Sequence, residues 1–274
     1  MDAFHIISTA PFFAKNNGAF ALENFDLYCA VLSALTWRRD GSRIFLYTDR
    51  PAAEYIRNSG LETVWDELRD TVPDDLDGID PVMFWAAGKL LAMRQMEAPC
   101  VMIDTDFIVW NKPGFGREII AAHLEDLNPD IYPPLEYFSA GAHSIPDFNR
   151  EVLPLNTAFF YVPDESFKEF YTSQAIAFMK SADRCGEWLR YMVFAEQRMA
   201  AMCAEYTGTG VKTLLDKDML FFPQENYTHL WGAKQKMREH PELRRELCGR
   251  FEARIRRDFP EWEWTIGKIR RASR

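Results

Sequence analysis

The chain has 274 residues, of which 47% are hydrophobic, so it is long and apolar enough to bury a sizeable core and is not expected to be disordered. Its formal net charge is -9, although residues 234–274 carry 13 Lys or Arg against 7 Asp or Glu. The acidic main body argues against nucleic acid as a partner, because phosphate contacts need clustered Lys and Arg.

The five cysteines show neither CxxC spacing nor a paired histidine pattern. The sequence therefore predicts buried free thiols in a reducing compartment, with no disulfide framework and no zinc site. The start, MDAFHIISTAPFF, has no basic leader, and no stretch approaches the roughly 18 apolar residues of a membrane span. We expect a soluble cytoplasmic protein.

Short β-rich runs alternate with helical patterns along the first 110 residues. Strands are predicted at residues 4–8, 43–49, 62–65 and 100–104, and helices at 21–37, 52–58 and 81–96. This alternation is typical of βαβ units, which build a parallel sheet with helices on its faces. The predicted fold class is therefore α/β.

The second half is less regular. Prolines break residues 111–155 into short pieces, which predicts loops and edge strands around a site. A returning strand is predicted at 157–162, followed by helices at about 164–181 and 187–204. Since no internal repeat or low-complexity segment is present, no second catalytic domain is indicated.

Two aspartates, Asp104 and Asp106, interrupt the apolar run CVMIDTDFIVW at residues 100–110. An unpaired carboxylate within a strand that is buried on both faces would be costly or would be forced to protonate. Ligands of open α/β sheets bind in the crevice at the carboxyl ends of the strands. We therefore expect the strand to end at Asp104 and the two carboxylates to meet a cation or a ligand there.

Three interpretations of this pair remain open. Carboxylate oxygens suit Mg²⁺ or Mn²⁺, and an added imidazole favours Mn²⁺. The pair could instead lie in a plain surface turn. The third interpretation is a haloacid-dehalogenase-type phosphatase, in which the first Asp would be the phosphorylated nucleophile. That motif normally lies on the first strand, however, and is not normally followed by residues such as Phe107 and Ile108.

Further motifs resemble one enzyme family. The stretch GKLLAMRQMEAPCVMIDTDFIV resembles the segment around the DxD motif of GT-A glycosyltransferases of the glycogenin-like, retaining type. LNTAFFYVPD looks like the Asn-containing strand of that family, AEQRM resembles its acidic-Gln pair, and HLWG matches its His-x-x-Gly. The four motifs span residues 89–232 in the family's order, which makes them more specific together than any is alone.

The resemblance implies a GT-A type nucleotide-diphospho-sugar transferase fold, a Rossmann-like mixed sheet flanked by helices. It also implies that Asp104, Asp106 and His229 bind Mn²⁺ or Mg²⁺, with Asp104 touching the donor ribose as well. Lys89 would face the sugar or the diphosphate.

On the sugar and acceptor side, the resemblance implies Asn156, Glu196 and Gln197, which with the two aspartates form the candidate catalytic set. Each has an ordinary alternative too, because Asn156 could cap a turn, Lys89 could meet solvent and His229 could be a core or loop histidine.

The chain departs from the family near its last motif. The pattern places a Lys six residues after the His, where this chain has Gln235, flanked by Lys234 and Lys236. The Lys that the family uses for the diphosphate is therefore missing at this position, and Gly232 and Lys234 are the candidates for donor binding in this segment.

Weaker candidates for donor binding follow the first two predicted strands. Ser8 and Thr9 end the first strand, and Asp49 ends the second, so all three are expected at the carboxyl edge of the sheet, where a base could bind. Such residues are also ordinary in turns.

Residues 233–274 are predicted to form a basic helical extension after a catalytic domain at 1–232. Leu243, Leu247, Phe251 and Ile255 recur every four residues and give an apolar stripe on an Arg-rich helix. The stripe is expected to pack on the catalytic domain. Alternatively, a basic amphipathic helix could lie on an anionic membrane surface, which would place the protein peripherally at the inner face of the membrane.

The expected function is metal-dependent transfer of a sugar from a nucleotide-sugar donor, with UDP favoured, to the hydroxyl of a saccharide, a lipid-linked saccharide or a protein. A retaining outcome rests on the resemblance alone. Polysaccharide biosynthesis is the corresponding cellular role. The alternative is a catalytically silent carbohydrate- or nucleotide-binding protein on the same fold, which the absence of Lys at position 235 keeps open.

Overall fold

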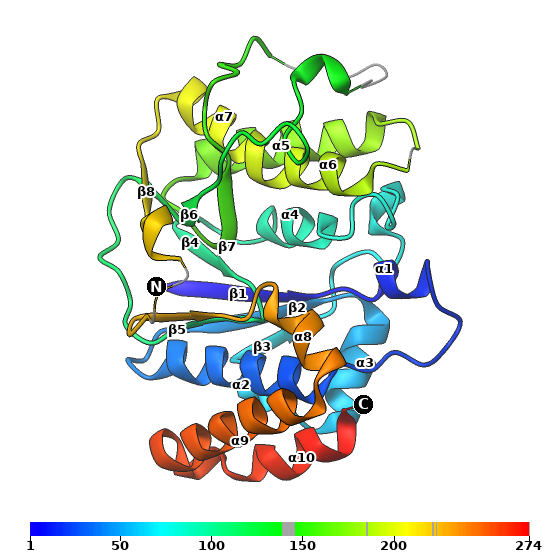
Figure 1. Cartoon of the computed structure of the whole chain (residues 1–274), viewed down its shortest axis with the longest axis vertical. Coiled ribbons are helices and arrows are strands. Elements are labelled where there is room, and N and C mark those ends of the chain that lie inside the picture. The colour runs from blue at the N-terminus through cyan, green and yellow to red at the C-terminus, as the bar shows by residue number, and fades with distance from the viewer. Residues whose placement is uncertain (139–145, 185, 221, 223, 274) are drawn as a thin grey trace.

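The computed structural model describes residues 1–138, 146–184, 186–220, 222 and 224–273. In this part of the chain a seven-stranded sheet, in the order β3-β2-β1-β4-β7-β6-β8, separates two layers of helices (Figure 1). Helices α4 to α7 lie on one side, and α2, α3 and α8 to α10 on the other. The predicted α/β class, with a mixed sheet flanked by helices and a helical C-terminal extension, is confirmed.

The helical bounds are as follows. The helices are α1 (Ala10–Phe13), α2 (Asn24–Arg38), α3 (Arg50–Ser59), α4 (Ala87–Met93), α5 (Glu165–Ser181), α6 (Trp188–Val193), α7 (Met199–Thr207), α8 (Ala233–Glu239), α9 (Pro241–Asp258) and α10 (Trp264–Ala272). Short 3-10 turns lie at Glu62–Val64, Leu76–Gly78, Leu135–Tyr137, Lys217–Met219 and Pro260–Trp262.

Four parallel strands form one half of the sheet: β1 (Asp2–Ile7), β2 (Ile44–Thr48), β3 (Glu67–Arg69) and β4 (Cys100–Ile103). The runs in β2 and β4 are buried throughout, as expected for strands covered on both faces. The strand predicted at 62–65 is wrong, because Glu62–Val64 forms a 3-10 turn and β3 starts later. Its apolar residues Val64 and Trp65 are nevertheless buried, which explains the strand-like pattern.

The other half of the sheet contains its one antiparallel strand among the described residues, β7. Strand β7 (Leu155–Val162) runs antiparallel to β4 and to β6 (Ile119–Leu124), and the short β8 (Val211–Thr213) pairs in parallel with β6. A separate two-stranded sheet joins β5 (Phe107–Val109) to β9 (Tyr227–His229) and places Phe107 opposite His229. This pairing brings His229, the first residue of the HLWG motif, beside the segment of the two aspartates.

Local signals explain several helix ends. Asp49 caps α3 by accepting a hydrogen bond from the Ala52 amide, and Gly60, with φ of 67°, ends that helix in the left-handed conformation that favours glycine. Asp164 caps α5 in the same way. The helix predicted at 187–204 is interrupted, because a π turn at Phe194–Arg198 separates α6 from α7.

The C-terminal helices share a core with the sheet. Helix α9 packs on α2, and α10 packs on α2 and α3. Phe251 and Ile255 are buried and Leu247 is partly buried against this core, whereas Leu243 is 44% exposed. The packed interpretation of the stripe is therefore confirmed except at Leu243, which lies in the first turn of α9.

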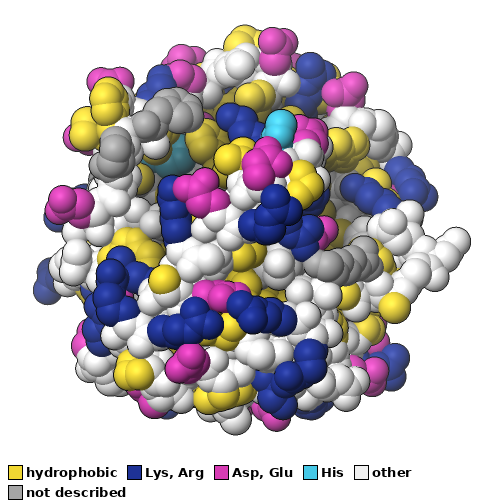
Figure 2. Space-filling view, turned by 60° about the horizontal axis from the view of Figure 1, so that its bottom comes forward, with side chains coloured by type: hydrophobic (Ala, Val, Ile, Leu, Met, Phe, Trp, Pro, Cys, Tyr) yellow, Lys and Arg dark blue, Asp and Glu magenta, His cyan; other side chains and the backbone are white. Residues whose placement is uncertain are grey.

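Acidic side chains of this extension pair with several of its basic ones, although the extension keeps more Lys and Arg than Asp and Glu. Arg250 pairs with Glu246, Arg254 with Asp258, and Arg270 with Glu252. Figure 2 shows Asp and Glu side chains among the Lys and Arg side chains of the face turned forward. Phe251 and Ile255 of the apolar stripe are buried in the protein, so they are not available to contact a membrane surface. Among the described residues, no helix is long and apolar enough to cross a membrane.

Four cysteines, Cys29, Cys100, Cys203 and Cys248, are free and buried, which confirms the prediction for them. Cys185 lies outside the described residues.

Candidate active site

A cleft of about 660 Å³ opens at the carboxyl ends of β1 and β4. Its lining includes Ser8 after β1 and Asp104 and Asp106 after β4. This is the crevice expected from the topology of a parallel sheet. Strand β4 ends at Ile103, so the two aspartates do lie beyond the buried strand.

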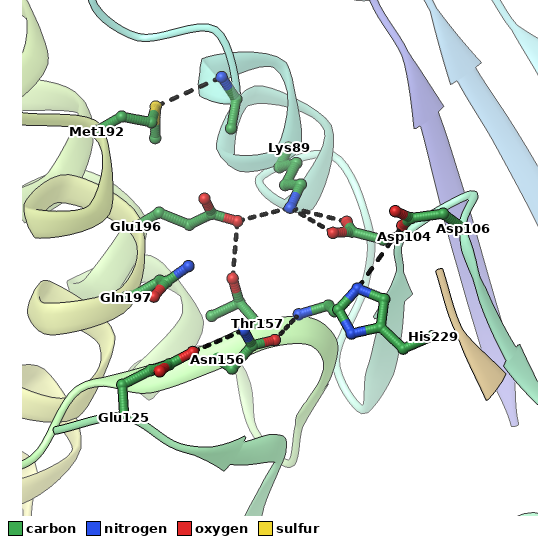
Figure 3. Close-up of polar contacts among 12 residues, drawn as sticks. Lys89, Asp104, Asp106, Glu125, Asn156, Thr157, Met192, Glu196, Gln197 and His229 are labelled. Carbon is green, nitrogen blue, oxygen red and sulfur yellow. Dashed lines mark hydrogen bonds and ion pairs between the residues drawn. The ribbon is translucent and has the colours of Figure 1, made fainter. Parts of the chain in front are cut away.

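Lys89, on α4, links the two sides of the cleft (Figure 3). Its Nζ lies 2.7 Å from Asp104 Oδ1 and 2.7 Å from Glu196 Oε1. Glu196 Oε1 also accepts a hydrogen bond of 2.7 Å from the Thr157 hydroxyl. Lys89 therefore serves as a structural partner of two carboxylates, and the interpretation of this lysine as a solvent-facing residue is wrong.

The π turn between α6 and α7 explains how Glu196 and Gln197 reach the cleft together. Such turns insert an extra residue into a helix and often occur at functional sites. The Tyr171 hydroxyl donates a 2.7 Å hydrogen bond to the Glu196 carbonyl oxygen, and the Tyr132 hydroxyl donates one to Gln197 Oε1. Both side chains line the cleft.

On the other side of Lys89, Asp106 lies among basic groups. Lys234 Nζ is 3.0 Å from Asp106 Oδ2 and 3.2 Å from Asp26 Oδ1. His229 Nε2 lies 3.9 Å from Asp106 Oδ1, and its ring stacks on Trp231 with an interplanar angle of 13°. The β5–β9 pair therefore brings His229 to the aspartates although the residues are far apart in the chain.

Burial shapes the pKa values of the site. Burial raises the pKa of Asp104, with Asp106 and Glu196 adding to the rise and Lys89 opposing it. For Lys89, burial favours the neutral amine, but Asp104 and Glu196 outweigh it and hold the pKa above its usual range. For Asp106, Lys234 and His229 outweigh burial and lower the pKa.

The cleft offers oxygen and nitrogen ligands that suit a divalent cation. Burial lowers the pKa of His229 to about 4, so its ring is neutral at pH 7 and can act as a ligand. Four carboxylates line the cleft against two lysines, which leaves a deficit of two positive charges. The described residues hold no cluster of three His, Cys, Asp or Glu already gathered around one point. The residue types and the charge balance thus fit a divalent ion, provided that the carboxylates turn from their lysines.

Asn156 lies at the cleft on β7 with both ends of its amide engaged. Its Nδ2 donates a 3.0 Å hydrogen bond to Glu125 Oε1, and its Oδ1 accepts one from the Ala158 amide. These contacts fix the orientation of the side chain without burying it completely, since it also lines the cleft.

Of the weaker candidates for donor binding, only some lie at the cleft. The Ser8 hydroxyl donates a 2.9 Å hydrogen bond to Asp49 Oδ2, and the Thr9 amide donates to the same oxygen. Thr9 and Asp49 are buried and do not line the cleft, whereas Ser8 does. Gly232 is exposed at the start of α8 and is also outside the lining.

Among the lining residues without a signal in the sequence are Asp26 and Thr157. Asp26 comes from the first turn of α2, where an acidic residue is ordinary, so no signal marked it. Thr157 lies within the LNTAFFYVPD motif, next to Asn156, but nothing in the motif marked it as a site residue. Trp85 and Trp231 also line the cleft, whereas the ring of Trp110 lies under Arg254.

Comparison with solved structures finds remote likenesses. The galactosyltransferase LgtC, in complex with donor and acceptor sugar analogs, is 12% identical with a TM-score of 0.47, over 91% of this chain and 95% of that chain. The PaToxG glycosyltransferase is 9% identical with a TM-score of 0.40, over 99% of this chain and 87% of that chain.

No curated protein matches the chain in sequence. A protein-family model matches residues 4–268, which is nearly the whole chain. The chain belongs to this family, DUF6734, a family of unknown function.

Proposed function

We propose that the protein is a glycosyltransferase that moves a sugar from a nucleotide-sugar donor, with UDP as the favoured nucleotide, to the hydroxyl of an acceptor. The observation that carries the proposal is the network of Asp104, Lys89 and Glu196 across a large cleft at the carboxyl edge of the sheet. The resemblance of four ordered motifs to glycogenin-like enzymes supports the same reaction class.

The leaving group sets the electrostatic requirement. When the bond between the anomeric carbon and the diphosphate oxygen breaks, the electron pair stays on the diphosphate and negative charge develops there. Lys234 and Lys89 are the ammonium groups that line the cleft near this charge. Both stay protonated, because the neighbouring carboxylates hold their pKa values above the usual range.

A divalent ion, Mn²⁺ or Mg²⁺, is part of the proposal. Asp104, Asp106 and His229 would hold it, and it would supply positive charge to stabilise the diphosphate and orient it. The charge deficit of the cleft supports this assignment, as does the neutral His229 ring.

The acceptor side is assigned to the residues across Lys89 from Asp106 (Figure 3). Asn156 is held by Glu125, and Glu196 is held by Lys89 and Thr157, so both side chains are oriented before a substrate arrives. Trp85 offers an aromatic ring face that could stack on a sugar face. As the bond to the acceptor oxygen replaces the bond to the diphosphate oxygen, the acceptor's hydroxyl proton passes to the departing diphosphate, and retention of configuration is part of this proposal.

The test is a screen of nucleotide sugars with Mn²⁺, in which release of the nucleoside diphosphate is measured with and without a mixture of simple saccharide acceptors. The proposal expects release from at least one donor, with UDP donors favoured, and faster release when an acceptor is present. Binding of nucleotide without release would instead support the catalytically silent protein. Release of inorganic phosphate from phosphate esters would support a phosphatase and overturn the proposal.

A further inference from the structure

A second pocket, of about 240 Å³, adjoins the main cleft. His229 and Trp231 line both hollows, so these two side chains lie between them. Phe107 and Tyr227 form aromatic walls of the second pocket, and His123 reaches it from β6. None of the residues assigned above to the donor or the acceptor explains this space.

The chemistry of the second pocket differs from that of the cleft. The described residues that line it include no Asp, Glu, Lys or Arg, whereas carboxylates and lysines crowd the cleft. A charged diphosphate would therefore be unbalanced in the second pocket, because a buried charge needs an opposite charge or several hydrogen bonds. The pocket suits an uncharged ligand.

One buried atom of a residue that lines the pocket has no hydrogen-bond partner among the described residues. His123 is 1% exposed, and its Nδ1 lies 3.0 Å from the Leu124 carbonyl oxygen. Since a carbonyl can only accept, Nδ1 carries a proton, which Glu125 Oε1 also faces at 3.7 Å. In the tautomer that these contacts select, Nε2 holds the lone pair. Nε2 is buried without a hydrogen-bond partner in the described part of the chain. Buried polar atoms are nearly always satisfied, so an O–H or N–H donor is missing here.

The size of the pocket favours more than a single water. A water takes up about 30 Å³ of liquid volume, far less than the space available, and an apolar ring alone would leave His123 Nε2 unpaired. The face of a sugar ring can pack on aromatic side chains while its hydroxyls donate hydrogen bonds. Phe107, Tyr227 and Trp231 supply the aromatic surface.

We propose that this pocket binds one uncharged sugar ring of the acceptor, with a ring hydroxyl donating to His123 Nε2. The proposal rests on the proposed function in one respect, namely that the bound saccharide is the acceptor. Trp231 lies 5.8 Å from the His123 ring and 6.1 Å from the His229 ring, so a sugar in the pocket lies one side chain from the cleft. The next unit of the same saccharide would present its hydroxyl there.

The backbone at Trp231 supports a functional role for this wall. Its φ of 31° lies in the left-handed region that favours glycine. Such conformations in a bulky residue are costly and cluster at ligand-binding sites. The conformation places the indole between the two pockets.

The experiment measures saccharide binding directly, without any donor. Methyl glycosides of common hexoses and N-acetylhexosamines are titrated into the full chain and followed by ligand-observed NMR, in parallel with a titration of UDP. Two variants alter the pocket. His123→Phe removes the nitrogen that accepts the hydrogen bond but keeps an aromatic ring, and Leu220→Trp fills part of the pocket with a larger side chain. Met219→Trp is the matched control, because Met219 precedes Leu220 in the chain but lies outside the lining.

We expect at least one glycoside to bind at millimolar concentration. His123→Phe and Leu220→Trp should each weaken it by about tenfold or more, with Met219→Trp and the UDP titration unchanged. The inference is overturned if no glycoside binds, if both pocket variants bind the glycoside like the wild type, or if phenol competes for the pocket equally well in wild type and His123→Phe. If the protein binds the glycoside through His123 but cleaves no donor, the sugar-binding pocket is supported and the proposed transferase function is contradicted.

Discussion

Lys89 Nζ lies 2.7 Å from Glu196 Oε1, although the two residues are 107 positions apart in the chain. The contact joins α4 to the π turn across the cleft, and Asp104 completes it from the end of β4. One ammonium thereby neutralises part of the charge of two buried carboxylates. Its removal has consequences for stability as well as for chemistry.

Lys89→Met should reduce turnover of the donor at least about 100-fold and lower the free energy of unfolding at pH 8 by about 3–5 kcal/mol, because it leaves buried carboxylates without their partner. The loss should be smaller at pH 5, where Asp104, whose pKa burial already raises, takes up a proton. Urea denaturation at the two pH values measures this. Lys236→Met, at an exposed lysine of α8, is the control and should behave like the wild type. A loss for Lys89→Met that did not depend on pH would contradict the electrostatic explanation.

His5 makes the native state sensitive to acid. Its Nδ1 accepts a hydrogen bond from Trp65 Nε1, and its Nε2 lies 3.0 Å from the Ser33 hydroxyl, so the ring is held neutral. Burial lowers the pKa of His5 from 6.5 to about 3, against a smaller opposing effect of Asp106. Between these pH values the unfolded chain binds a proton that the native chain does not, so the free energy of unfolding should fall as the pH is lowered through this window, by about 5 kcal/mol in total.

His5→Gln should flatten that part of the stability–pH curve, whatever its uniform effect on stability. His240→Gln, at an exposed histidine, provides the matched control and should keep the wild-type slope. Chemical denaturation at several pH values between 6.5 and 4 checks the slopes. Equal slopes for His5→Gln and the wild type would show that His5 does not carry the effect.

The apolar stripe of α9 should show a gradient along the helix. Ile255→Ala should lower the free energy of unfolding by about 2–5 kcal/mol, because Ile255 is fully buried and the change leaves a cavity. Leu243→Ala should change it by less than about 0.5 kcal/mol, because Leu243 is 44% exposed. Thermal and urea unfolding of the two variants compares the ends of one stripe. Similar losses at both positions would contradict the packing described for α9.

The fold was predictable to the extent that local patterns determine it. The run CVMID and its two aspartates predict a buried strand that ends at a ligand-binding edge, and β4 does end at Ile103. The four-residue repeat predicts the buried side of α9 at Phe251 and Ile255. The pattern of residues 62–65 misled because Val64 and Trp65 are buried in a turn, and burial alone does not distinguish a turn from a strand.

The candidate site was less predictable, because its partners come from distant segments. Thr157 and Asp26 carry no local signal for their contacts with Glu196 and Lys234, which depend on how α2, β7 and the π turn pack. The second pocket depends on the β5–β9 pairing that sets His229 and Trp231 between two hollows. Such pairings between segments far apart in sequence are not encoded in periodicity.

The central claim is that Asp106 takes part in metal-dependent cleavage of a nucleotide-sugar donor. Asp106→Asn removes one carboxylate but leaves Lys234 paired with Asp26, so the variant should still fold. Because Lys234 and His229 lower the pKa of Asp106, the charged carboxylate stabilises the native state, and the variant should melt somewhat below the wild type when no metal is added. Asp183→Asn, at an exposed aspartate, is the control for the same chemical change.

The decisive measurement is the rate of nucleoside diphosphate release from the best donor, for the wild type, Asp106→Asn and Asp183→Asn, with Mn²⁺ and again with a chelator in excess. We expect release by the wild type and by Asp183→Asn with Mn²⁺, a loss of at least about 100-fold on chelation, and a comparable loss in Asp106→Asn even with Mn²⁺. Release by Asp106→Asn at the wild-type rate, or release that chelation leaves unchanged, would contradict this claim.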